Sequence, residues 1–272
     1  MKNGWNPWHG CHKLSEGCAN CYVYRIDDRY ERDASEVGKN ADFDLPVRMS
    51  KNGPAIPWGS TVWTCFSSDF FLEDADGWRA DAWRMIARRP DIHFIIITKR
   101  IARFHVALPS DWGDGYPNVT IGCTCENQRR ADERLPLFLA APIKHRMIVC
   151  EPLLEELDIK SYLSPALVET VTAGGESGSG ARLCRFEWIK RISADCAATG
   201  VAFSYHQTGA LLEVNGRVWQ ASGGAGEARR RRRVRHAKGI KRRCALFLLD
   251  GNDLFAVFPW FMRKNTISTL KN

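Results

Sequence analysis

Short apolar runs, separated by polar and glycine-containing connections, recur along residues 60–206. The clearest covers residues 92–98, where three consecutive isoleucines form the centre of a run rich in β-branched side chains. This composition is typical of a strand that is covered on both faces of a sheet. The strands predicted in this way are, in chain order, residues 60–66, 92–98, 118–124, 146–151, 169–176 and 201–206.

Segments with the periodicity of helices lie between these strands. The predicted helices are residues 74–89, a short stretch after residue 100, residues 128–140, the broken segment 153–163, and residues 186–198. Strands that alternate with helices indicate βαβ units built around a parallel sheet. Six or so such units favour an α/β fold, a partial or full parallel β/α barrel of the TIM type.

The amino-terminal part follows a different pattern. Residues 19–33 predict a helix with Tyr22, Ile26 and Tyr30 on one face, because these apolar positions recur four residues apart. Residues 34–57 contain several prolines and glycines without a period, which predicts a long excursion over the surface.

The carboxyl-terminal part is also less regular. The apolar segments 246–251 and 255–261 are expected to pack back against the body of the protein. We therefore predict a barrel domain over residues 1–208, which includes an amino-terminal cysteine loop, and an irregular C-terminal extension over residues 209–272.

The composition is that of a globular protein large enough to bury a sizeable core. The chain has 272 residues, of which 44% are hydrophobic, and no window approaches the ~20 continuous apolar residues of a membrane span. Ten cysteines without a visible secretory signal favour metal binding and packing over a disulfide framework. We expect a cytoplasmic protein with no membrane partner.

Positive charge is concentrated in one strip. Residues 228–243 contain ten of the 39 lysines and arginines, so the rest of the chain has 29 basic against 31 acidic residues. Clustered cations such as Arg229–Arg243 release counterions from phosphates, which makes nucleic acid a candidate partner. A solvated insertion after the glycine-rich segment 222–226 is an equal alternative. A protein partner stays a further candidate.

The most informative stretch is the amino-terminal loop, residues 5–22. It places Cys11, Cys18 and Cys21 in a C-x6-C-x2-C pattern, with Gly10 and Gly17 directly before two of the cysteines. Glycine allows the backbone to turn and to approach a bound group, and soft thiolates suit zinc or an iron–sulfur cluster. Three thiolates without an obvious fourth leave one metal position open, as in a cubane cluster that binds a cofactor.

Zinc is the main alternative for this loop. A structural zinc takes four ligands, and His9 or His12 stands near enough in the sequence to supply the fourth. His9 is the better placed of the two, because His12 directly follows Cys11. A zinc-stabilised nucleic-acid-binding protein without catalytic activity is therefore the second hypothesis.

Polar residues follow almost every predicted strand. Because reactive groups of β/α barrels gather at the carboxyl ends of the strands, these residues predict a single polar mouth. The candidate ligand-binding residues at these ends are Ser67, Asp69, Thr98, Lys99, Glu126, Asn127, Glu151, Gly174, Gly175 and Glu176.

Chemistry suggests a role for several of them. Lys99 suits a carboxylate or phosphate, and Asp69 or Glu126 suits ribose hydroxyls. Gly174 and Gly175 allow a close backbone approach, and a carboxylate such as Glu176 accepts hydrogen bonds from an amine.

The sequence from Trp5 to Tyr22 resembles the opening of a phage- and bacterium-encoded family of unknown function that carries a three-cysteine motif. Further landmarks follow in the same order over nearly the whole chain: Ser68-Asp-Phe70, Thr98-Lys-Arg100, residues 122–128, Glu151-Pro-Leu-Leu154, Gly174-Gly-Glu-Ser-Gly178 and Leu248-Leu-Asp-Gly251. That family in turn resembles radical S-adenosylmethionine enzymes, whose usual spacing is C-x3-C-x2-C.

The resemblance implies a [4Fe-4S] cluster on Cys11, Cys18 and Cys21, with S-adenosylmethionine bound at the fourth iron and at the strand ends. It implies an enzyme that generates a 5′-deoxyadenosyl radical and removes hydrogen from a substrate, for which a nucleic acid or nucleotide is the candidate. A phage-derived protein that keeps the fold but has lost the chemistry is a third hypothesis.

Overall fold

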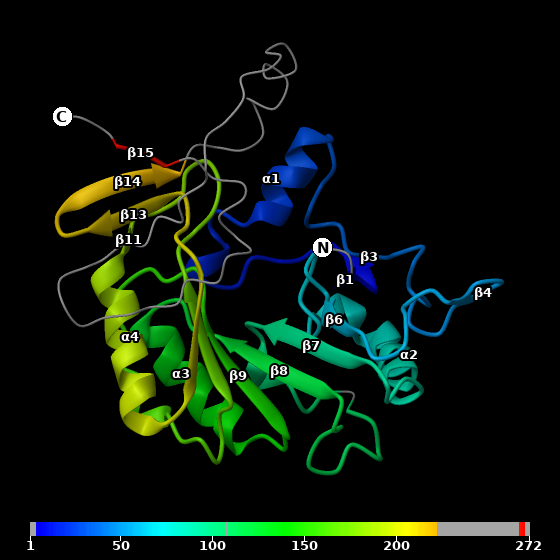
Figure 1. The fold of residues 1–272 in the computed structure, drawn as a ribbon. Coiled ribbons are helices and arrows are strands. Elements are labelled where there is room, and N and C mark those ends of the chain that lie inside the picture. Colours follow the sequence, from blue (N-terminus) through cyan, green and yellow to red (C-terminus); the bar gives the residue numbers. More distant parts are fainter. Residues whose placement is uncertain (1–3, 107, 222–266, 270–272) are drawn as a thin grey trace, which may run out of the picture.

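A seven-stranded parallel sheet forms the centre of the computed structural model, which describes residues 4–106, 108–221 and 267–269. The strand order follows the chain, and every neighbouring pair is parallel. The sheet curls into a half-barrel with helices packed on its outside (Figure 1). Its strands are β1 (Gly4–Trp5), β6 (Thr61–Thr64), β7 (His93–Thr98), β8 (Val119–Thr124), β9 (His145–Cys150), β10 (Thr170–Gly174) and β12 (Ala202–Gln207). The predicted partial β/α barrel is confirmed.

Three helices connect these strands close to their predicted positions. They are α2 (Asp76–Ala87), α3 (Gln128–Ala140) and α4 (Phe186–Thr199). Short 3₁₀ turns add η1 (Glu16–Cys18), η2 (Glu73–Ala75), η3 (Ile101–Arg103) and η4 (Lys160–Tyr162). The bounds of α3 agree with the sequence because Asn127 caps its first turn, accepting a hydrogen bond from the Arg130 backbone N–H.

The hydrophobic core lies between the sheet and these helices. Large rings fill it, among them Trp5, Phe70, Trp83 and Phe94, all buried. All six residues of β8 are buried, whereas every second residue of β7 is only half-buried. The prediction of a strand covered on both faces is therefore wrong for β7, because a half-barrel leaves part of this strand open.

Three smaller sheets surround the half-barrel. Two are short antiparallel pairs, β2 (Trp8–His9) with β3 (Gly38–Lys39) and β4 (Met49–Ser50) with β5 (Gly53–Pro54). The third contains, in order, β11 (Cys184–Arg185), β13 (Leu211–Val214), β14 (Arg217–Ala221) and β15 (Ile267–Thr269). The division at residue 208 stays a prediction.

Several predicted segments lie outside the described residues. They are the basic strip at 228–243 and the apolar segments 246–251 and 255–261. Within the part of the chain that the structure describes, no helix is long and apolar enough to cross a bilayer.

Two predicted helices differ from the structure. Helix α1 covers only Tyr22–Arg29, and its buried residues are Val23 and Asp27, while Tyr22, Ile26 and Tyr30 are exposed. The predicted helix at residues 153–163 forms only the single turn η4. The physical reason is local: Leu153 N–H donates to the Gly174 carbonyl and Leu154 N–H to the Glu126 carbonyl, so this backbone bonds to the strand ends instead of to itself.

Candidate functional site

The three cysteines of the amino-terminal loop differ from the other cysteines in their exposure. Cys11, Cys18 and Cys21 are partly exposed, whereas the six other described cysteines, Cys65, Cys123, Cys125, Cys150, Cys184 and Cys196, are buried. Cys21 directly precedes α1 and is its N-cap residue. Its backbone N–H donates to the Cys18 carbonyl at 3.3 Å, so these two residues share one turn.

The loop is fixed first to the segment that follows β6. The Gly10 N–H donates to the Ser67 carbonyl at 3.1 Å, the Ser67 hydroxyl donates to the Trp8 carbonyl at 3.1 Å, and the Ser68 hydroxyl donates to the Gly10 carbonyl. Gly10 has a φ of +90°, and a Cβ there would overlap the Glu36 carbonyl group. The glycine before Cys11 is therefore required by the close approach of two backbone segments.

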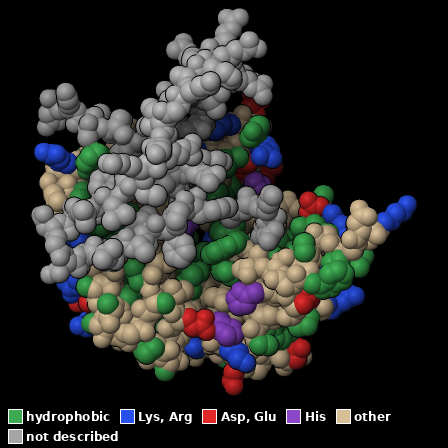
Figure 2. All heavy atoms as spheres, viewed as in Figure 1, with side chains coloured by type: hydrophobic (Ala, Val, Ile, Leu, Met, Phe, Trp, Pro, Cys, Tyr) green, Lys and Arg blue, Asp and Glu red, His purple; other side chains and the backbone are tan. Residues whose placement is uncertain are grey.

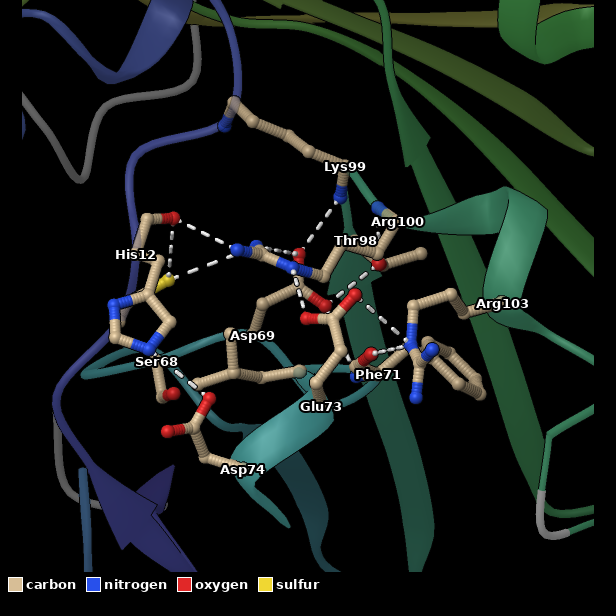
Figure 3. A network of polar contacts seen from close by, with 12 residues as sticks. His12, Ser68, Asp69, Phe71, Glu73, Asp74, Thr98, Lys99, Arg100 and Arg103 are labelled. Carbon is tan, nitrogen blue, oxygen red and sulfur yellow. Dashed lines mark hydrogen bonds and ion pairs between the residues drawn. The ribbon is translucent and has the colours of Figure 1, made fainter. Parts of the chain in front are cut away.

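Asp69, a buried carboxylate after β6, connects this segment to β7 (Figure 3). Its Oδ1 accepts from the Thr98 hydroxyl at 2.7 Å and its Oδ2 from the Lys99 N–H at 2.9 Å. The same Oδ2 lies 3.6 Å from Arg100 Nη1. Asp69 and Thr98, both predicted site residues, thus fix the chain at the carboxyl end of β7. Asp69 holds the Lys99 backbone N–H and lies beside the Arg100 guanidinium.

Arg100 brings that guanidinium to the cysteine loop. Its Nη2 donates to the His12 carbonyl at 2.7 Å, and its Nη1 lies 3.7 Å from Cys11 Sγ (Figure 3). Burial raises the pKa of the Cys11 thiol to about 12, Arg100 acts against this, and the nearby thiols of Cys18 and Cys21 raise it further. The Cys11 thiol therefore lies beside a fixed positive charge.

Glu126, which follows β8, is fully buried and holds the middle of the loop. It accepts hydrogen bonds from the Ser15 hydroxyl and from the Gly17 N–H at 3.3 Å, and it pairs with Arg134 of α3 at 2.7 Å. A Cβ on Gly17 would lie 3.0 Å from the Glu126 carboxylate carbon. Glycine at this position allows the loop to settle on the carboxylate.

Glu176, beyond β10, holds the end of the loop. Its Oε2 accepts from Asn20 Nδ2 at 3.0 Å, and Arg182 donates to both carboxylate oxygens. Burial raises the pKa of Glu176, but the hydrogen bonds from Arg182 and Asn20 outweigh it and lower the pKa overall. Arg182 also donates to the Glu16 carbonyl at 2.9 Å, which closes the network around the loop.

The remaining predicted residues lie at the same edge of the sheet. Asn127 caps α3, and Glu151 accepts from Gln207 and pairs with His206 at 2.6 Å. Burial raises the pKa of Glu126, but Arg134 and then Lys99 outweigh it and lower the pKa overall. Lys99 has no hydrogen bond or ion pair from its ammonium group within the described residues.

The fold itself explains why residues 174 and 175 are glycines. A Cβ on Gly175 would overlap the Thr208 carbonyl oxygen, and one on Gly174 would lie 3.1 Å from the Gln207 carbonyl oxygen. These glycines allow β10 and the segment after β12 to approach each other. Their role in binding a ligand stays a prediction.

Sequence reasoning did not assign roles to the arginines of this network. Arg100, Arg134 and Arg182 each pair with one of the three buried carboxylates. Arg100 stands in the polar segment after a strand, which was a usable signal. Arg134 lies within a helix and Arg182 within a loop, and neither position is distinguished from an ordinary surface arginine in the sequence.

A single metal ion and a cubane cluster require different arrangements of ligands. In the described part of the chain, no three His, Cys, Asp or Glu side chains converge as ligands of a single ion. The Nε2 atoms of His9 and His12 pair with Asp27 at 2.6 Å and Asp74 at 3.0 Å. In a cubane cluster each cysteine binds a different iron, so three thiols on one loop suit this group by residue type, and the cluster itself stays a prediction.

Fold and site together define an α/β half-barrel protein with a three-cysteine loop held over the carboxyl ends of its strands. The chain belongs to the family described as Protein of unknown function (DUF5131), whose model matches residues 1–251. Neither the curated proteins nor the solved structures contain a match to it.

Proposed function

We propose that this protein is an iron–sulfur enzyme of the radical S-adenosylmethionine type. The observation that carries the proposal is the selective exposure of Cys11, Cys18 and Cys21 on a loop that lies over the strand ends of a parallel half-barrel. Carboxyl ends of barrel strands are where such folds place their reactive groups. A loop with three thiols at that position supplies three ligands of a cubane and leaves the fourth iron for a small molecule.

In this proposal the strand ends have two separate tasks. Ser67, Asp69, Thr98, Glu126 and Glu176 position the loop, because their polar atoms already bond to the loop or to the residues that hold it. Arg100 lies beside Cys11 and offsets the negative charge of a bound thiolate.

The second task is binding of S-adenosylmethionine. The Lys99 ammonium suits the carboxylate of the cofactor, while Glu151, Asn127, Gly174 and Gly175 line the same strand ends. A bound [4Fe-4S] cluster and S-adenosylmethionine together supply the one-electron chemistry that yields methionine and a 5′-deoxyadenosyl radical. The protein's own residues orient the cofactor and shield it from water.

For the substrate we propose a nucleic acid or nucleotide. Ten lysines and arginines within residues 228–243 support this choice, because clustered cations bind polyanions by releasing counterions. Replacing the ten with glutamine should weaken binding to DNA or RNA and reduce its salt dependence. Binding that is unaffected would remove the support of the strip for this substrate class.

The enzymatic test uses protein purified and reconstituted without oxygen. Chemically reduced wild type, incubated with S-adenosylmethionine, should release 5′-deoxyadenosine, which is measured by liquid chromatography with mass spectrometry. Cys18→Ala should release none, whereas Cys196→Ala, which removes a buried thiol of α4, is the matched control and should retain release. Equal release from wild type and Cys18→Ala would contradict the proposal.

A further inference from the structure

A surface groove of about 230 Å³ lies apart from the cysteine loop, between the β4–β5 pair and the carboxyl end of α2. Its lining residues are Val47, Met49, Pro54, Trp58, Arg88 and Arg89. The β4–β5 pair projects from the body (Figure 1), and hydrophobic side chains gather beneath it with basic side chains at its tip (Figure 2). None of these residues belongs to the site described above.

The floor of this groove is fixed by Arg89, a buried arginine. Its Nη1 donates to the Pro46 carbonyl at 2.5 Å and its Nη2 to the Ile56 carbonyl at 3.0 Å. Its Nε pairs with Asp91 at 2.9 Å. Because Arg89 joins both ends of the projecting segment to α2, the groove is preformed, which reduces the ordering that a ligand must cause.

The wall of the groove is a tryptophan that is turned toward solvent. Trp58 is 70% exposed, and it makes no ring–ring contact within the described residues. The edge of its indole rests over Gly53, where a Cβ would lie 3.8 Å from Cη2 and Cζ3. The edge of the ring thus packs against Gly53, and most of the ring stays exposed for stacking. Large exposed apolar groups of this kind mark interaction sites.

Uncompensated positive charge lies beside this ring. Arg88 lines the groove together with Trp58, and Lys51 lies in the turn between β4 and β5. Both cations are exposed and form no ion pair with any described residue, and no acidic residue lines the groove. A second groove of about 420 Å³ also contains Arg88. Its two carboxylates, Asp44 and Asp81, are each already paired, with Arg48 and Arg84. The surface therefore offers cations to an anionic ligand.

We propose that this groove binds single-stranded nucleic acid, with a base stacked on Trp58 and backbone phosphates at Arg88 and Lys51. A planar ring beside unpaired cations matches the two parts of a nucleotide, its base and its phosphate. Stacking on an aromatic ring accepts any base, and it is the usual way in which proteins bind single strands without reading their sequence. The inference is independent of the cluster.

The test must separate this groove from the basic strip at residues 228–243. Stacking is largely independent of salt, whereas phosphate contacts are not, so affinity is measured as a function of salt concentration. The probe is a fluorescein-labelled oligothymidylate, titrated with the full-length protein and followed by fluorescence anisotropy. The variants are Trp58→Ala, Trp58→Phe and Arg88→Gln, and the controls are Tyr30→Ala and Arg129→Gln, which change an exposed ring and an exposed cation elsewhere.

Trp58→Ala should weaken binding at least about fivefold at every salt concentration without changing the salt slope, since one stacked base contributes about 1–3 kcal/mol. Trp58→Phe should retain most of the affinity, and Arg88→Gln should weaken binding and reduce the salt slope. Thermal unfolding should show all variants folded, because both side chains are exposed.

Two outcomes would overturn the proposal. One is unchanged affinity in both Trp58→Ala and Arg88→Gln, which would assign all nucleic-acid binding to other surfaces. The other is a wild type that sediments as a dimer while Trp58→Ala sediments as a monomer, with oligonucleotide binding unaffected. That result would make the groove an interface between two copies of this chain.

Discussion

The two ends of the parallel sheet both carry polar residues, yet they use them differently. At the carboxyl ends, Asp69, Glu126 and Glu176 bond to the cysteine loop or to the residues that hold it. At the amino ends, the polar residues bond to neighbouring strands: His93 to Thr120 at 2.8 Å, and His145 to Glu169, the residue before β10, at 2.6 Å.

The two ends also differ in burial. The Glu126 side chain is 0% exposed and the Glu176 side chain 6%, whereas Glu169 at the opposite end is 53% exposed. Burying a carboxylate is unfavourable unless it is paired and hydrogen-bonded. The comparison indicates that one end of the sheet is built to hold a loop in one position, and the other end only completes the strands.

The largest effect is expected at Glu126. Glu126→Gln removes the charge that pairs with buried Arg134, so the free energy of unfolding should fall by about 3–5 kcal/mol, as when a buried ion pair loses one partner. Urea unfolding followed by circular dichroism measures this change. Glu169→Gln is the matched control at the amino ends, and it should change stability by about 0–1 kcal/mol because the Glu169 carboxylate is exposed. Equal losses of unfolding free energy in the two variants would contradict the proposed difference between the two ends of the sheet.

A smaller effect is expected from the backbone of the cysteine loop. Gly10→Ala places a Cβ against the Glu36 carbonyl group at a φ of +90°, so unfolding should become easier by about 1–3 kcal/mol. Iron loading should fall as well, because Cys11 follows directly. Gly38, which pairs with His9 directly before Gly10, has open space where a Cβ would lie, so Gly38→Ala should be tolerated. A Gly10 variant with normal stability and iron content would show that the loop is not held as described.

The dependence of stability on pH should also differ between the two ends. The folded pKa of Glu176 lies below its usual 4.5, because the hydrogen bonds from Arg182 and Asn20 outweigh burial. The stabilisation that ionised Glu176 gives the folded protein is therefore present above about pH 4.5 and is lost as the pH falls below this value. Burial, and then His145, lowers the pKa of His93 from 6.5, so its contribution is present above about pH 6.5 and is lost on acidification from there.

These two windows can be separated with two variants. In Glu176→Gln the free energy of unfolding should depend less on pH than in wild type only below about pH 4.5. In His93→Gln this loss of pH dependence should occur only near pH 6. Urea unfolding over a pH series gives both profiles. A Glu176→Gln profile that is parallel to wild type at acidic pH would contradict the assigned bonding of this carboxylate.

The smallest change in stability is expected at Lys99. Lys99→Ala removes no hydrogen bond or ion pair of the ammonium group within the described residues, only its attraction to the Glu126 carboxylate, so stability should change by less than about 1 kcal/mol. Iron content should also be normal, while binding of S-adenosylmethionine, measured by equilibrium dialysis, should weaken. Lys190→Ala on α4 is the control for removal of a lysine. Normal cofactor binding in Lys99→Ala would remove this residue from the proposed pocket.

The architecture was largely predictable from the sequence. The β-branched strands and the helices between them follow from apolar periodicity, and the bounds of α3 follow from its Asn127 cap. The segment at 153–163 was not predictable, because its backbone bonds to Gly174 and Glu126, whose positions only the assembled sheet fixes. The exposed face of α1 has the same origin: the loop contacts, and not the helical period, decide which side faces inward.

The site was predictable only in its position. Residues that follow parallel strands must meet at one edge, so the polar mouth and its carboxylates could be anticipated. Whether Glu126 binds a ligand or the chain itself depends on Ser15, Gly17 and Arg134, which are distant from one another in the sequence and carry no signature. Long-range pairing of this kind is decided by the folded geometry.

The most direct test of the central claim is the iron and acid-labile sulfide content of protein reconstituted without oxygen, together with its absorption spectrum. The account predicts about four irons and four sulfides per chain, a broad visible absorption, and loss of both in a variant with Cys11, Cys18 and Cys21 replaced by alanine. One zinc per chain, with no iron and no visible absorption, would contradict it and would make the cysteine loop a structural zinc site.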